Sequence, residues 1–118
     1  MRGLIIIAHG SKKEISNEEF IKMVENIKIK DKSYDLIDGS FLELASPSFE
    51  ESIIKMVKKG VDKIFIYPFF LNSGKHVKVD IPNIIDRFTN EYSNISFTTL
   101  EHFGKSRYIE DIILKDIS

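Results

Sequence analysis

Four short segments of the chain have the hydrophobic pattern of β-strands. Leu4–Ala8 and Val61–Tyr67 are nearly continuous apolar runs, which is typical of strands that are buried on both faces. Residues 34–44 mix alternating apolar and polar side chains with Gly39, which predicts a strand with a candidate β-bulge at the glycine. Residues 95–100 form a fourth, shorter apolar segment. The pattern therefore predicts four strands.

The segments between and after these strands have helical periodicity. Residues 15–29 place apolar side chains three and four positions apart, as one face of a helix requires. Ser48, followed three residues later by Glu51, predicts the start of a second helix through a capping box. A third helix begins near 80–82, or is already under way there, and residues 109–117 predict a closing helix.

Strands and helices thus alternate along the chain, with short connections and no linker or repeat. This order predicts an α/β fold: a single domain over residues 1–118, built as a three-layer sandwich around a four-stranded, mainly parallel sheet. Ligands of such folds bind beyond the carboxyl ends of the strands. Candidate functional residues are therefore sought in the loops that follow the first three strands.

Composition narrows the classes of function. The chain has 118 residues, of which 42% are hydrophobic and 30% charged, and a formal net charge of -1. A nucleic-acid-binding domain usually has an excess of basic residues, so none is expected as a partner. No segment approaches the roughly 20 apolar residues of a membrane span. The chain has no cysteine, which excludes disulfides and cysteine-ligated metals, and a cytoplasmic location is expected.

The loops after the first three strands hold a candidate metal site. His9 follows the first strand, Glu43 lies near the end of the second, and His76 closes the loop after the third. Two imidazoles and a carboxylate suit a divalent transition metal, and imidazole can also accept protons near neutral pH. The alternative is that both histidines are merely hydrogen-bonded loop residues. His102, after the fourth strand, is interpreted as structural.

Several cations and backbone donors lie at the same end of the predicted sheet. Four loop lysines gather there, and they favour an anionic ligand: Lys12, Lys13, Lys75 and Lys78. Backbone N–H groups near Ser11 and at 73–74 can bind carboxylates. No GxGxxG follows the first strand and no GxxxxGK[ST] occurs, so neither a dinucleotide site nor a P-loop is supported.

At these residues the sequence resembles the small form of the CbiX sirohydrochlorin cobaltochelatases, in the class II chelatase superfamily. Four segments carry the resemblance, in order along nearly the whole chain: Ile7-Ala-His-Gly-Ser11, Phe41-Leu-Glu-Leu-Ala-Ser-Pro47, Pro68–Val77 with Asp80-Ile-Pro82, and Phe103-Gly104. The chain departs from the family's pattern at Ser46, where many members have an acidic residue. Glu43 is then the remaining acid of that segment.

The resemblance implies a chelatase-like fold and an ATP-independent enzyme with no required cofactor. It implies that His9 and His76 bind the incoming metal, that His9 also accepts a pyrrole proton, and that the protein is a homodimer. Glu43 is the expected supporting acid. The residues expected to contact the tetrapyrrole are Ser11, Lys12, Ser46, Leu71, Asn72, Ser73, Gly74, Lys75 and His76.

The leading hypothesis is insertion of Co2+ into sirohydrochlorin, for cobalamin biosynthesis. Insertion of Fe2+, for siroheme, or of Ni2+ is the alternative within the same class, because all three ions accept imidazole ligands. A non-catalytic carrier of metal or tetrapyrrole is the alternative from another class. An α/β domain that binds no metal is the third.

Overall fold

The computed structural model describes residues 1–118 and contains one four-stranded sheet. Its strands are β1 (Arg2–Ala8), β2 (Leu36–Phe41), β3 (Lys63–Pro68) and β4 (Ser96–Thr99). They lie in the order β2-β1-β3-β4, and every pairing is parallel. The alternating fold predicted from the sequence is confirmed, with β1 at the centre of the sheet.

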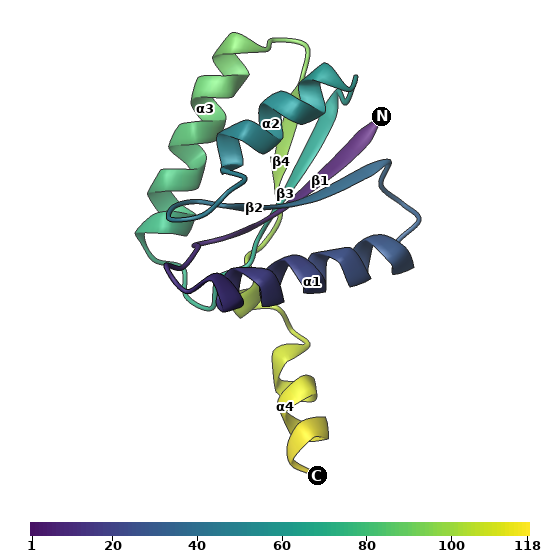
Figure 1. Ribbon diagram of the computed structural model, residues 1–118, viewed down its shortest axis with the longest axis vertical. Helices are drawn as coiled ribbons and strands as arrows, with labels where there is room; N and C mark the ends of the chain where they lie inside the picture. The colour runs from purple at the N-terminus through teal and green to yellow at the C-terminus, as the bar shows by residue number, and fades with distance from the viewer.

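Helices cover both faces of this sheet (Figure 1). The four α-helices are α1 (Glu14–Lys30), α2 (Phe49–Lys58), α3 (Ile81–Glu91) and α4 (Ile109–Ile117), and two short turns are η1 (His76–Asp80, π-helical) and η2 (Phe103–Lys105, 3-10). The α1 helix lies on one face, while α2 and α3 lie on the other. None of the helices is long and apolar enough to cross a membrane.

The core has two halves because β1 is buried on both faces. Ile5 and Ile7 pack into the cluster beneath α2 and α3, and both are fully buried. Leu4 and Ile6 point the other way, into the cluster beneath α1. Because successive side chains of a strand point to opposite faces, β1 contributes apolar side chains to both hydrophobic layers of the sandwich.

The second strand differs from its prediction in two respects, its regularity at Gly39 and its end. The predicted bulge at Gly39 is wrong: the pairing of β1 with β2 is regular, and Gly39 lies opposite Ile6. A Cβ at Gly39 would press on Val24, 3.0 Å away, so the glycine allows α1 to approach the sheet. The β2 strand ends at Phe41, and residues 42–44 therefore belong to the loop that carries the candidate acid.

The second helix begins where its capping box predicts. The hydroxyl of Ser48 accepts a hydrogen bond from the backbone N–H of Glu51 (3.1 Å), and the carboxylate of Glu51 accepts one from the backbone N–H of Ser48 (3.0 Å). These bonds satisfy two backbone donors that the helix itself leaves unpaired. The bond from the Ser48 backbone lowers the pKa of the Glu51 carboxyl below its ordinary value of 4.5.

The closing helix forms as predicted but lies outside the three layers. Figure 1 shows α4 extending away from the sheet and the other helices along the longest axis of the molecule. That axis measures 49 Å, against 31 and 28 Å for the other two. Every residue from 110 to 118 is exposed.

We expect Ser48→Ala to lower the free energy of unfolding by about 1 kcal/mol, because the side-chain cap of α2 is lost. Urea denaturation measures this value, with Ser93→Ala, at an exposed serine in the turn before β4, as the matched control. The stabilisation from Glu51 should be present above pH 4.5 and be lost as the pH falls through its lowered folded-state pKa. Equal midpoints for both variants would contradict this account of the helix start.

Candidate functional site

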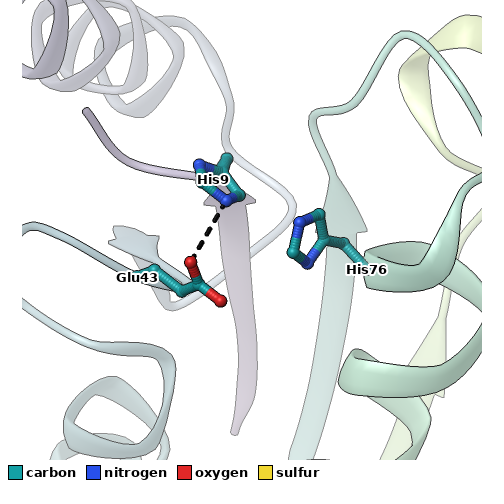
Figure 2. A group of neighbouring side chains, drawn as sticks. All are labelled: His9, Glu43 and His76. Carbon is teal, nitrogen blue, oxygen red and sulfur yellow. Dashed lines mark ion pairs between the residues drawn. The ribbon is translucent and has the colours of Figure 1, made fainter.

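Three loops at the carboxyl end of the sheet bring the predicted metal ligands together. His9 directly follows β1, Glu43 lies two residues beyond β2, and His76 begins η1 after β3. Figure 2 shows the three side chains pointing toward one another from these separate segments. Parallel neighbours in the sheet thus place residues 34 and 67 positions from His9 at one point, as the topology requires.

A glycine holds the first two loops in contact. Gly10 has a φ of 97°, and a Cβ at this position would collide with the carbonyl oxygen of Glu43. The backbone N–H of Glu43 in turn donates to the carbonyl oxygen of His9 at 2.9 Å. The backbones on either side of the site are therefore fixed to each other before any ligand binds.

A second glycine supports the loop that leads to His76. A Cβ at Gly104 would collide with the carbonyl oxygen of Leu71, and the N–H of Gly104 donates to the carbonyl oxygen of Phe70 at 2.9 Å. The motif Phe103-Gly104, far away in sequence, thus supports the start of the loop at residues 71–76. The phenyl ring of Phe70 also stacks on the imidazole of His76, with 6.0 Å between centroids.

The spacing of the donor atoms suits a metal ion. One ligand atom from each of His9, Glu43 and His76 lies within 4.8 Å of the other two. His9 Nε2 and Glu43 Oε2 are 3.4 Å apart, which matches the roughly 3.4 Å edge of a tetrahedron with metal–ligand bonds of about 2.0–2.1 Å. The His9 and His76 rings are 4.6 Å apart between centroids. A small movement of the His76 side chain would bring its ligand atom within reach of a metal ion that is bound by His9 and Glu43.

Both ring nitrogens of His9 face oxygen atoms. Nδ1 lies 2.9 Å from the carbonyl oxygen of Gly10, which can only accept, so Nδ1 carries the hydrogen of a neutral ring. The lone pair of Nε2 then faces the Glu43 carboxylate. A cation between them, either a proton on Nε2 or a metal ion, would be attracted to both atoms. Proton and metal therefore compete for the same place.

His76 has a carboxylate on its other nitrogen. Its Nδ1 lies 2.8 Å from Asp80 Oδ2, so Nδ1 donates and Nε2 is left with a free lone pair. Lys75 Nζ lies 3.5 Å from the second oxygen of Asp80. Sequence reasoning did not assign Asp80 to the site. The signal was the spacing of four residues at a helix start, which places the two side chains on one face.

The predicted tetrapyrrole contacts, apart from His76, lie in three places. Ser11, Lys12 and Ser46 line a groove of about 830 Å³ between α1 and the loop after β2, which does not include the metal-ligand cluster. Lys75 lines a cavity of about 280 Å³ with Glu43 and Asp80, next to that cluster. The other loop residues are exposed on the surface: Leu71, Asn72, Ser73 and Gly74.

The remaining histidine and lysines lie outside the cluster. His102 is 7% exposed, at the end of the segment that follows β4, and does not belong to the metal-ligand group. Lys13 precedes α1 at its N-cap position, and Lys78 is exposed on η1. Of the four predicted cations, Lys75 is the one with a carboxylate partner in the site.

We expect Gly10→Ala to weaken Co2+ binding at least 10-fold, because the added methyl group displaces the Glu43 backbone and the positive φ strains alanine. Calorimetric titration with Co2+ measures the change. Gly74→Ala is the matched control, since a Cβ there meets nothing within 4 Å. Equal affinities for the two variants would show that this backbone contact does not position the ligands.

Asp80→Ala should reduce Co2+ affinity by about 10- to 100-fold, because His76 loses the acceptor that fixes its tautomer and ring orientation. The same titration gives the affinity, and Asp86→Ala removes an exposed carboxylate from the same helical segment as a control. If the Asp80 variant bound Co2+ as tightly as the control, the contact between Asp80 and His76 would have no role in metal binding.

The sequence is similar to known proteins over nearly its whole length. The family model CbiX matches residues 3–118. A sirohydrochlorin ferrochelatase from Arabidopsis thaliana is 33% identical over 94% of this chain and 49% of its own length. A sirohydrochlorin cobaltochelatase from Sulfolobus acidocaldarius is 32% identical over 96% of this chain and 87% of its own.

Solved structures of similar proteins have the same fold as this chain. The sirohydrochlorin chelatase SirB from Bacillus subtilis, in complex with cobalt, superposes with a TM-score of 0.88 at 28% identity. The alignment covers 98% of this chain and 50% of that one. The chain thus spans about half the length of some relatives and most of the length of others. By sequence and by fold, this chain belongs to the CbiX family.

Proposed function

We propose that this chain catalyses the ATP-independent insertion of Co2+ into sirohydrochlorin. The observation that carries the proposal is the cluster of His9, Glu43 and His76, which offers two imidazoles and a carboxylate within 4.8 Å in a chain of the CbiX family. The metal is a substrate in this reaction. It has to be bound, delivered and released, and a half-exposed site with few ligands suits that task better than a closed one.

Cobalt is the proposed ion, with Fe2+ and Ni2+ as alternatives. Relatives named as cobaltochelatases include archaeal proteins that match 72 to 96% of this chain, and the SirB structure contains cobalt. Relatives named as ferrochelatases are 29 to 33% identical to this chain, against 32 to 38% for these cobaltochelatases. Imidazole nitrogens accept all three ions, so the ligand set alone does not choose among them.

The two histidines divide the work of the reaction in this proposal. Insertion exchanges one divalent ion for the two N–H protons of the free tetrapyrrole. His76 presents a free Nε2 lone pair and binds the incoming ion first. The position between His9 Nε2 and the Glu43 carboxylate lies between two acceptors. A metal that leaves it for the tetrapyrrole can be replaced there by one pyrrole proton, while the second proton passes to the water that reaches this half-exposed site.

The tetrapyrrole is proposed to lie against the exposed loop at residues 71–76. Leu71 is 68% exposed and offers apolar surface to the macrocycle. Ser11, Lys12 and Ser46 lie beyond the cluster in the groove beside α1, where they can hold carboxylates at the edge of the ring. Lys75 is the nearest cation to the metal ligands.

Two copies of the chain are proposed to pair as a homodimer. Relatives occur at about the length of this chain and at about twice that length. A second copy of the chain would take the place of the other half of a longer relative. The exposed tetrapyrrole loop would then be covered by the partner.

The proposal predicts that the purified protein accelerates the absorbance change of sirohydrochlorin on addition of Co2+ above the rate without protein. His76→Ala should lower the rate at least 100-fold, whereas Asp86→Ala should leave it unchanged. Fe2+ and Ni2+ are compared under the same anaerobic conditions.

Equal rates with and without protein for all three ions would overturn the proposed activity. Tight binding of sirohydrochlorin or Co2+ without any acceleration would indicate the carrier function instead. A higher rate with Fe2+ than with Co2+ would overturn the choice of metal and leave the reaction class intact.

A further inference from the structure

Leu44 has a backbone conformation that leucine normally avoids. Its φ is 67°, in the left-handed region, and it is the one non-glycine residue of the chain with a positive φ. A Cβ makes this conformation unfavourable, whereas glycine adopts it without strain. Strained residues of this kind gather at binding and catalytic sites. A leucine in this position therefore points to a use for its side chain beyond the fold.

Backbone contacts on both sides hold the strained residue in place. Directly before Leu44, the N–H of Glu43 donates to the carbonyl oxygen of His9 at 2.9 Å. Three residues after Leu44, the carbonyl oxygen of Pro47 accepts a hydrogen bond from the N–H of Phe41 at 2.9 Å, which closes the loop. The surrounding structure thus keeps Leu44 in its left-handed conformation.

The side chain of Leu44 lies where a ligand can reach it. It is 55% exposed and lines the groove of about 830 Å³ beside α1. The other apolar residues of that lining are buried or half-buried: Ile21, Phe41 and Ala45. Leu44 also follows Glu43, which belongs to the metal-ligand cluster. The side chain therefore offers exposed apolar surface between the metal ligands and the groove.

We propose that Leu44 is a substrate-binding residue, held in a strained backbone conformation so that its side chain contacts one face of the tetrapyrrole. This inference rests on the proposed function and adds a contact to it. The faces of the macrocycle are flat and apolar, whereas its carboxylates lie at the edge. Leu44 packs on a face, while Ser11, Lys12 and Ser46 lie in the groove where the carboxylates are held. Because Leu44 follows Glu43 directly, the same contact keeps the ring next to the bound metal.

The relative stability of two variants tests the strain. Alanine is more stable than glycine within a helix, but the order reverses at a residue with a positive φ. We expect a higher urea midpoint for Leu44→Gly than for Leu44→Ala. Ile29→Gly and Ile29→Ala are the matched pair, since Ile29 is exposed near the end of α1 and should show the helical order. The helical order at both positions would overturn the proposal, because Leu44 would then carry no strain.

Titration with metal-free sirohydrochlorin, followed by absorbance, tests the contact. Leu44→Ala should raise the Kd roughly 5- to 15-fold, because the exposed half of a leucine side chain no longer packs on the ring. Leu44→Met retains apolar surface and should bind within about 3-fold of the wild type, and Ile29→Ala should bind as the wild type does. The Co2+ affinity of Leu44→Ala, measured by calorimetry without tetrapyrrole, should be unchanged, since backbone contacts position Glu43.

The outcomes separate this inference from the proposed function. If Leu44→Ala bound sirohydrochlorin as tightly as the wild type, the assignment of Leu44 would be wrong and the chelatase proposal would stand. Equal losses of sirohydrochlorin and Co2+ affinity would also overturn the assignment, because Leu44 would then act only through the position of Glu43. A wild type that binds no sirohydrochlorin would overturn both proposals.

Discussion

The backbone of Glu43 passes so close to Gly10 that any side chain at position 10 would collide with it, and this contact sets the geometry of the whole site. It joins the loop after the central strand to the loop after its neighbour. The parallel pairing of β1 with β2 brings the two loops side by side, and the glycine lets them touch. The imidazole of His9 and the acid of the second loop are consequently presented from a rigid frame. Such rigidity suits a site that must hold a metal without enclosing it.

Two histidines with similar surroundings acquire different properties through the nitrogen that each carboxylate contacts. The carboxylate near His9 faces the nitrogen that points into the site, so a cation placed between the two atoms is attracted to both. The carboxylate near His76 lies behind the ring and leaves the inward nitrogen free. The proposed metal insertion requires one group that binds a cation and another that exchanges a cation for a proton. The π-helical turn that carries His76 and Asp80 makes this difference possible, because it brings the two side chains into contact at the mouth of the site.

The sequence predicted the features that depend on local patterns and left open those that depend on the path of the backbone. The apolar run of β1 and the capping box at Ser48 identified a strand and a helix start correctly, because burial and capping leave a signal within a few residues. The end of β2 was placed too late, since Leu42 and Leu44 continue the alternation after the pairing has ended. Asp80 was missed as a site residue because its role depends on a contact across one helical turn. Periodicity predicted α4, but it carries no information on where the helix lies relative to the sheet, and the helix extends away from the three layers.

His9, Glu43 and His76 are proposed to hold the metal together before it enters the tetrapyrrole. X-ray absorption spectroscopy of the protein loaded with one equivalent of Co2+ measures the ligand shell directly. We expect two imidazole nitrogens at about 2.0–2.1 Å with a carboxylate oxygen at a similar distance, and the loss of one imidazole in His9→Ala or in His76→Ala. A shell of water and carboxylate oxygens, with no imidazole scattering that either substitution removes, would contradict it.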